Sequence, residues 1–152
     1  MEKVTLKLHE FYQLDAELSG ITNAKTNEIV SKGLLGEKLK LTIKYWLTEL
    51  AKTVATEKEA IEKIKENLIK KYGEEGEGGE VSIPFYINIV KNEEGEIISS
   101  EPNPKFIEFQ NEFNELLQEE KEIEHKEFKL SDFENVESEG AYITFFKLVK
   151  PE

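Results

Sequence analysis

The segment from Leu34 to Tyr72 has a helical pattern longer than any other in the chain, and it restricts the fold most strongly. It contains no proline, and Gly36 is its one glycine. Steps that alternate four and three residues meet apolar side chains at seven of nine positions, the nine being Ile43, Leu47, Leu50, Val54, Glu57, Ile61, Ile64, Leu68 and Lys71. This stripe predicts a helix that packs lengthwise against another helix. Roughly 38 residues at about 1.5 Å each would give a rod of about 57 Å.

A second helix is predicted over residues 104–123. Asn103 is a favourable N-cap residue, and the proline that follows it is favoured at the first helical position. The apolar stripe of this helix consists of Phe106, Phe109, Phe113, Leu116, Leu117 and Ile123. Because the second helix is half as long as the first, an antiparallel return would place its end near Val54 and would bring Glu120 close to Lys58.

Between the two helices, the pattern changes to the alternation that is typical of strands. An acidic, glycine-containing loop occupies residues 74–80. The apolar residues that then alternate with more polar ones are Val81, Ile83, Phe85, Ile87 and Ile89. Residues 92–95 (Asn-Glu-Glu-Gly) predict a type I turn with a bulge, and residues 96–99 a returning strand. Pro84 indicates a sheet edge, so we expect a β-hairpin over residues 81–99 with an exposed edge.

The two terminal segments supply the remaining apolar residues. Residues 3–8 alternate as a short strand does, and residues 9–19 carry an apolar helical face followed by glycine. Residues 20–33 are predicted to form a loop, with a brief extended piece at 28–30. The run 141–149 is rich in aromatic and β-branched residues and fits either a strand or a helix.

We therefore expect the whole chain to form a single, mainly α domain with some β structure (α+β). Its expected architecture is a long antiparallel helical hairpin with a β-hairpin at its tip and a small base formed by the N- and C-terminal segments. The base would comprise residues 1–54 and 124–152, the helical stalk residues 55–73 and 104–123, and the β-hairpin tip residues 81–99.

The charge of the chain restricts its partners. The sequence has 32 acidic and 20 basic residues, for a net charge of −12, and it contains no arginine. Such a chain repels nucleic acid and anionic membranes, so we expect no direct binding to either. The N-terminus lacks the apolar stretch of a signal peptide, and no run approaches the length of a membrane span. The expected location is the cytoplasm.

The sequence offers few residues for chemistry. It has no cysteine, and His9 and His125 are its only histidines, with no metal-ligand spacing around either. No serine lies in a nucleophile motif, and no phosphate-binding loop is present. We therefore predict no catalytic residue, no cofactor and no metal site, and we expect a protein that is not an enzyme. Tyr45 and Trp46 lie near the stripe of the long helix, where core packing and partner binding are alternative interpretations.

The order of these segments resembles a known group of proteins. Residues 68–75 read Leu-Ile-Lys-Lys-Tyr-Gly-Glu-Glu, and an acidic insert separates them from the proline-initiated helix Phe-Ile-Glu-Phe-Gln-Asn-Glu-Phe-Asn-Glu-Leu-Leu at 106–117. An acidic exit at 122–124 leads to Phe-Lys-Leu-Ser-Asp-Phe at 128–133. Over most of residues 34–137 the chain resembles uncharacterised small acidic coiled-coil proteins of tailed bacteriophages and prophages. The resemblance implies a phage origin and a helical-hairpin fold, with a location in the host cytoplasm or the virion, and it carries over no catalytic residue.

These features favour a non-enzymatic phage protein that acts through protein–protein interaction, as a virion or assembly component or as an accessory factor. The helical stalk would display the β-hairpin, and Phe85, Tyr86, Ile87 and Ile89 would bind a partner by extending its sheet. The alternative role for these four residues is to cover the end of the stalk. The partner would be a phage or host protein, or a second copy of the chain.

The alternative function is an acidic anti-defence inhibitor of a host protein, which would act as a mimic of DNA. A mimic needs one face nearly free of lysine. The long helix instead mixes its glutamates with Lys58, Lys63, Lys65, Lys70 and Lys71. A third possibility, an enzyme or small-molecule binder, would require a deep pocket that combines a histidine with a buried carboxylate.

Overall fold

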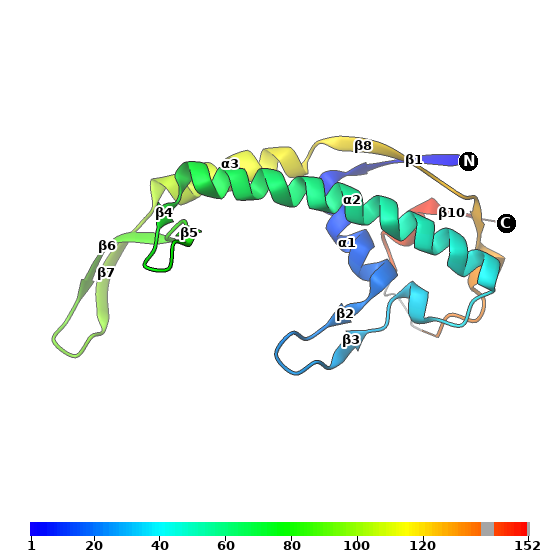
Figure 1. The fold of residues 1–152 in the computed structure, drawn as a ribbon, viewed down its shortest axis with the longest axis horizontal. Helices are drawn as coiled ribbons and strands as arrows, with labels where there is room; N and C mark the ends of the chain where they lie inside the picture. Colours follow the sequence, from blue (N-terminus) through cyan, green and yellow to red (C-terminus); the bar gives the residue numbers. More distant parts are fainter. Residues whose placement is uncertain (138–141, 152) are drawn as a thin grey trace. The chain divides into compact units, whose positions relative to one another are not determined.

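The computed structural model describes residues 1–137 and 142–151. The chain divides into two compact units. Unit 1 contains residues 1–59 and 118–152, and unit 2 is the continuous stretch Ala60–Leu117. Helix α2 (Leu41–Tyr72) contributes residues to both units. Within the described ranges, three α-helices and ten short strands form an α+β fold in which every sheet has only two strands (Figure 1).

Unit 1 begins with an antiparallel ribbon of β1 (Glu2–Lys7) and β8 (Glu120–His125), in which Val4 lies opposite Ile123. The N-terminus thereby pairs with a segment more than a hundred residues away. Helix α1 (Leu8–Ser19) follows β1 directly. The carboxylate of Glu10 accepts a hydrogen bond from the backbone N–H of Lys7 at 3.1 Å, which satisfies a donor at the start of this helix.

A single apolar core fills unit 1. Helix α1 turns Phe11, Leu14 and Leu18 inward at helical spacing, and α2 contributes residues from its first half. The remaining members come from β1, β8, the 3₁₀ helix η1 (Leu34–Gly36), β9 (Phe128–Lys129), the 3₁₀ helix η2 (Leu130–Phe133) and the C-terminal segment. The buried residues of this core are Leu6, Phe11, Leu14, Leu18, Leu34, Leu47, Leu50, Val54, Ile123, Phe128, Phe133, Tyr142, Phe145 and Leu148.

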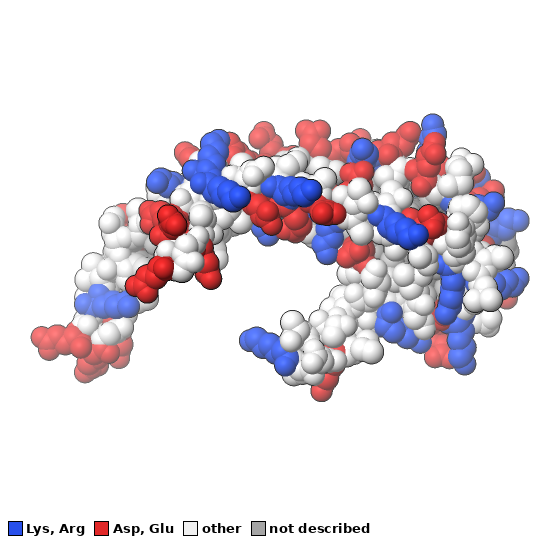
Figure 2. All heavy atoms as spheres, in the orientation of Figure 1, with Lys and Arg blue, Asp and Glu red and all other residues white. Residues whose placement is uncertain are grey.

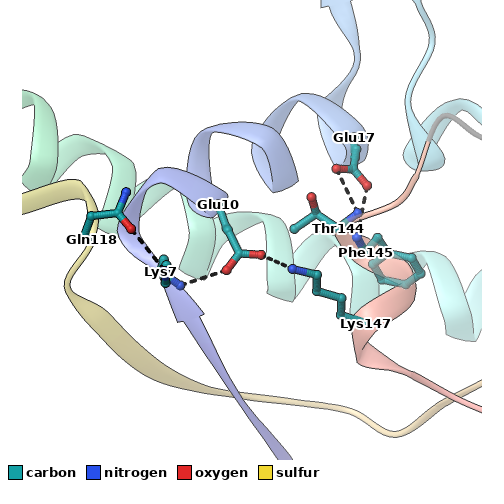
Figure 3. Close-up of polar contacts among 7 residues, drawn as sticks. All are labelled: Lys7, Glu10, Glu17, Gln118, Thr144, Phe145 and Lys147. Atoms are coloured by element: carbon teal, nitrogen blue, oxygen red, sulfur yellow. Dashed lines mark hydrogen bonds and ion pairs between the residues drawn. The ribbon is translucent and has the colours of Figure 1, made fainter. Parts of the chain in front are cut away.

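Buried carboxylates fix the C-terminal segment to this core. Glu17 of α1 accepts hydrogen bonds from the backbone N–H groups of Thr144 at 3.3 Å and Phe145 at 3.0 Å, at the start of the 3₁₀ helix η3 (Phe145–Leu148) (Figure 3). Lys147 of the same helix donates to the Glu10 carboxylate. Strand β10 (Val149–Lys150) then pairs in parallel with β9. The C-terminal segment is therefore part of unit 1 and not a free tail.

Glu37 provides a second buried anchor. Its side chain accepts hydrogen bonds from the Tyr142 hydroxyl at 3.0 Å and from the backbone N–H of Glu137 at 3.1 Å. The ammonium group of Lys32 lies 3.4 Å from the same carboxylate, so the buried charge has a cationic partner. This one carboxylate joins two stretches of chain that are about a hundred residues apart in sequence.

Residues 20–33, which were predicted to form a loop, contain a short hairpin of unit 1 between α1 and η1. It consists of β2 (Ile21–Thr22) and β3 (Ile29–Ser31), which pair in antiparallel fashion. Gly20 and Gly33 flank the hairpin with φ values of 86° and 71°, and each packs its Cα against the backbone of the opposite strand end. Only glycine fits this close approach.

Unit 2 contains the second half of α2, helix α3 (Pro104–Leu117) and two hairpins. Strands β4 (Glu74–Glu75) and β5 (Val81–Ser82) form the first hairpin. Strands β6 (Tyr86–Lys91) and β7 (Ile97–Pro102) form the second. Asn103 connects β7 to α3, because its Oδ1 accepts from the N–H of Lys105 at 3.1 Å while its Nδ2 donates to the Pro84 carbonyl at 2.7 Å. An ion pair of 3.4 Å between Lys71 and Glu112 joins α2 to α3.

The long antiparallel helical hairpin that the sequence suggested is wrong, and the described residues do not form a coiled coil. Helix α2 begins at Leu41, because residues 34–36 form the separate turn η1. Helix α3 ends at Leu117, and residues 120–125 form β8 instead of continuing the helix. In β8 only Ile123 and His125 are buried, a two-residue alternation that suits a strand, and β1 supplies the hydrogen-bonding partner.

Two further details of that expectation also change. Glu120 lies opposite Lys7 in the β1–β8 ribbon and not beside Lys58, whose ammonium group pairs with Asp15 at 3.0 Å. The hairpin expected over residues 81–99 is present as β6 and β7, but it spans residues 86–102, and residues 81–82 instead pair with β4 in a separate hairpin. The division of the chain into base, stalk and tip stays a prediction.

Several local expectations are confirmed. The first strand and first helix lie within one residue of their predicted bounds, and α2 ends at Tyr72 as its terminal lysines and following glycine indicate. The turn at 92–95 closes β6 and β7, with the Asn92 side chain accepting from the backbone N–H groups of Glu94 and Glu96. In the ambiguous run 141–149, Ala141 lies outside the described residues, while 145–148 is 3₁₀ helix. No helix in the described part of the chain is both long and apolar enough to cross a bilayer.

Candidate protein-interaction surface

More large apolar side chains are exposed on the hairpin of β6 and β7 than are fully buried in unit 2. Every residue of β7 is exposed, as is every residue of β6 except Ile87. We call the exposed apolar side chains of this hairpin and its entry the β6–β7 surface, which consists of Phe85, Tyr86, Ile89, Val90, Ile97 and Ile98. The buried apolar side chains described for unit 2 are only Ile61 and Phe109. Large apolar side chains that are left exposed together on one element mark interaction sites in soluble proteins.

The edges of the hairpin are irregular. Between Ile87 and Val90, β6 has two residues where β7 has one, and Ile98 is an extra residue on β7. Asn88 occupies the first irregularity with φ of 51°, a left-handed conformation that asparagine tolerates better than most residues. Such shifts interrupt the regular row of backbone groups that a partner strand would need. The exposed side chains, and not the edges, are therefore the stronger candidate for recognition.

A groove of about 330 Å³ lies at the entry to the hairpin. Phe106 and Phe109 of α3 form one wall, and Phe85 stands edge-on against Phe106 with 4.5 Å between ring centroids. The other lining residues come from α2 and from the β5 region, and they are Lys65, Ile69, Val81, Ser82 and Ile83. We call this the Phe85 groove. Because Phe85 belongs to both features, the groove continues the β6–β7 surface.

The stretch of chain that carries most of these apolar residues is acidic. Residues 73–103, which we call the acidic segment, contain eight glutamates and one lysine, Lys91. Within residues 1–137 and 142–151, none of these eight carboxylates forms an ion pair with a lysine. Of the eight, only Glu96 and Glu101 have side-chain partners among the described residues, the neutral amides of Asn92 and Asn88. Acidic side chains gather at the turn end of the β6–β7 hairpin, whereas lysines are interspersed with them elsewhere on the face drawn (Figure 2).

Helix α2 presents a different balance of charge just before the acidic segment. The pKa of Lys71, near the end of this helix, is raised above its usual value because its ammonium group forms hydrogen bonds with Tyr72 and with Glu112. Lys65 lies over the ring of Phe113 at 5.6 Å from its centroid. These cations are held by groups of unit 2 and do not neutralise the acidic segment.

The four residues predicted from the sequence to bind a partner differ in how exposed they are. Phe85, Tyr86 and Ile89 are exposed, and Ile87 is half-buried. Ile97 and Ile98, which are 61% and 65% exposed, were expected only to form a returning strand. The sequence feature that could have indicated their exposure is two adjacent apolar residues in a strand for which no other predicted element supplies an apolar face to pack against.

The two histidines occupy ordinary positions. His125 is buried in unit 1, where its Nδ1 lies 2.8 Å from the Lys126 carbonyl and its ring stacks on Phe128. His9 is exposed on α1. In the part of the chain that the structure describes, no cluster of three or more histidine, aspartate or glutamate residues could hold a metal ion.

The aromatic pair on α2 divides between the two interpretations. Trp46 packs against the core of unit 1, whereas Tyr45 is exposed and meets the Trp46 ring edge-on, with 5.0 Å between centroids. The Trp46 side chain therefore has a packing role within unit 1.

Comparison of the chain with protein-family models, curated proteins and solved structures finds no match.

Proposed function

We propose that this chain is a non-enzymatic protein that acts by binding another protein through the β6–β7 surface. The observation that carries the proposal is the imbalance within unit 2, which leaves six large apolar side chains exposed on one hairpin and its entry, whereas Ile61 and Phe109 are the only buried apolar residues described for this unit. Removing apolar surface from water contributes about 25 cal/mol for each Å². A partner that covered this hairpin would therefore be bound with a substantial favourable term.

The resemblance to small phage proteins suggests which kind of partner the chain binds and where. The partner would be a phage or host protein, and the chain would serve as a virion or assembly component or as an accessory factor in the host cytoplasm. A DNA-mimic role is less well supported, because lysines are interspersed with carboxylates on the face in Figure 2. The apolar hairpin has no use in a mimic of a phosphate backbone.

A pair of matched variants tests the proposal. Ile97→Ser/Ile98→Ser removes two exposed apolar side chains from the β6–β7 surface. Ile29→Ser/Val30→Ser removes two side chains of similar exposure, 72% and 66%, from the β2–β3 hairpin of unit 1. Each protein, expressed with an affinity tag in the producing cells, is cross-linked and purified, and its partners are identified by mass spectrometry.

We expect a partner that copurifies with the wild type and the β2–β3 variant and is lost from the β6–β7 variant. The same partner is then purified and titrated against all three proteins by calorimetry. Circular dichroism checks that both variants remain folded, which the exposure of the substituted residues favours. An unchanged set of partners for all three proteins would overturn the proposed function.

A further inference from the structure

We propose that the partner presents a basic, extended segment in which lysine or arginine alternates with apolar residues, and that one of its apolar side chains enters the Phe85 groove. This inference rests on the proposed function and names the chemistry of its partner. It is carried by three features of unit 2: the charge of the acidic segment, the length of the exposed hairpin and the apolar groove at its entry.

Charge selects a cationic partner. The acidic segment contains eight glutamates against Lys91 alone, and no lysine among the described residues pairs with those carboxylates. By contrast, Glu112 of α3 in the same unit is paired with Lys71. A partner that covers the apolar hairpin also removes water from the neighbouring carboxylates, which is costly unless the partner supplies positive charge. An acidic or neutral partner would leave that cost uncompensated.

The shape of the hairpin selects an extended segment. Strand β6 has six residues, so the exposed face is about 20 Å long at about 3.3 Å per residue. Carboxylates that form no ion pair within the described part of the chain lie before this strand, at Glu80, and after it, at Glu93 and Glu94. An extended segment of about six residues spans this length and presents alternate side chains to the surface. A segment in which cationic and apolar residues alternate therefore places its apolar side chains against the hairpin and keeps its cations free to reach the glutamates.

The Phe85 groove supplies a position for an anchoring side chain. Its walls are mostly aromatic and aliphatic, from Phe85, Phe106 and Ile69 among others. A concave apolar site next to a flatter apolar surface is where one aromatic or branched side chain contributes most to binding.

A second copy of this chain fits the surface poorly. In a symmetric dimer formed through the β6–β7 surface, each copy would bring the four glutamates of this hairpin and its turn, Glu93, Glu94, Glu96 and Glu101, against Lys91 alone. Like charges placed opposite one another are destabilising. The apolar side chains alone would permit self-association, and the charges around them argue for a partner of opposite sign.

Labelled synthetic peptides test the inference with the full-length protein. The first decapeptide alternates lysine with valine and carries one central phenylalanine. The second replaces every lysine by glutamate, the third replaces every lysine by threonine, and the fourth keeps the lysines but replaces valine and phenylalanine by serine. Binding is measured by fluorescence anisotropy at low and high salt. We expect the first peptide to bind about tenfold more tightly than the other three, and its binding to weaken as salt increases.

Variants locate the binding site. Glu93→Gln/Glu94→Gln should weaken binding of the first peptide roughly fivefold, and Phe85→Ser should weaken it further. The control Glu108→Gln/Glu115→Gln removes the same charge from exposed positions of α3 and should leave binding unchanged. Light scattering of the protein alone should show a monomer.

The outcomes separate this inference from the proposed function. Equal binding of the lysine and threonine peptides would overturn the basic partner and leave the apolar surface as a binding site. The inference would also be overturned if the first peptide did not bind, or if the lysine–valine and lysine–serine peptides bound equally well. It would likewise be overturned if both glutamine variants lost the same binding affinity, or if the protein formed a dimer that masks Ile97 and Ile98. The proposed function itself is tested separately, by whether the partner that copurifies with the wild type is lost from Ile97→Ser/Ile98→Ser.

Discussion

Glu17 shows how a single acidic residue contributes to this fold when its surroundings are apolar. Its side chain lies on the buried face of α1, between Leu14 and Leu18 in sequence, where a charged group would be costly without partners. The first N–H groups of a helix have no partner within that helix. Glu17 accepts from two of them, at Thr144 and Phe145, so each group satisfies the other (Figure 3).

Substitution of Glu17 should therefore release the C-terminal segment. Glu17→Ala leaves two buried N–H groups without an acceptor, and each such loss costs about 1–3 kcal/mol. Glu17→Gln keeps one acceptor oxygen and should cost less. Urea unfolding monitored by Trp46 fluorescence measures both changes, with Glu28→Ala on the exposed β2–β3 turn as the control. A stability of Glu17→Ala equal to that of the control would contradict this role.

Glu10 makes a pH-dependent contribution to the stability of the folded protein. Burial raises the pKa of the Glu10 carboxyl, but hydrogen bonds from the Lys147 ammonium group and the Lys7 backbone N–H outweigh burial and hold that pKa below its usual value. A lowered folded pKa gives stability that is present above the pKa of the unfolded chain and is lost as the pH falls through the folded pKa. Lys147→Met should therefore raise the pKa of Glu10 and reduce stability at neutral pH.

The stability difference between the wild type and Lys147→Met should shrink as the pH falls through the folded pKa of Glu10. A carbon-detected NMR titration of the Glu10 carboxyl measures the pKa, and urea unfolding at several pH values measures stability. Lys25→Met removes an exposed cation of the β2–β3 turn and serves as the control. A stability difference that stays constant with pH would show that Lys147 acts through packing alone.

At the scale of elements, the sequence patterns predicted those segments whose partners are local. Helix α1 and the end of α2 follow from helical spacing and from terminal glycines and lysines. For the residues of β8 the sequence pattern predicts a helix, because Ile123 falls near the apolar stripe of α3. What makes them a strand is β1, which lies more than a hundred residues earlier. A pairing partner so distant leaves no local signal.

The candidate surface was predictable in part for the same reason. The alternation of apolar residues predicts a strand near a sheet edge that contains Phe85, Ile87 and Ile89, with Tyr86 between the first two. The exposure of Ile97 and Ile98 depends on the sheet having only two strands, with no helix over either of these residues. Apolar residues in a strand are usually covered, so their exposure emerges only from the tertiary structure.

The β2–β3 hairpin gives a prediction about an element as a whole. A Cβ at Gly33 would lie 2.4 Å from the backbone nitrogen of Gly20, and the residue has φ of 71°. Gly33→Ala should therefore force the base of this hairpin apart and cost about 1–3 kcal/mol. Gly78→Ala is the matched control, because a Cβ there meets no other atom within 4 Å. Urea unfolding compares the two variants, and equal stabilities would contradict the close approach.

At the scale of the whole molecule, the apolar core and the candidate surface belong to different units. Every buried residue of the large core cluster lies in unit 1, and none lies within 60–117. Unit 2, which is one continuous insertion, holds the β6–β7 surface and the acidic segment. The stability of unit 1 should therefore not depend on the unit that we propose binds the partner.

Excision of unit 2 tests this separation. Residues 60–117 are replaced by a short glycine–serine linker that joins Glu59 to Gln118. These ends are suitable for joining, because Glu57 and Lys121 form an ion pair of 3.6 Å within unit 1. The core cluster remains complete, so we expect cooperative unfolding, with the near-ultraviolet circular dichroism of Trp46 retained. Mass spectrometry should also show that the copurified partner is absent. Loss of cooperative unfolding would mean that the truncated α2 cannot hold the core, and retention of the partner would place the binding surface in unit 1.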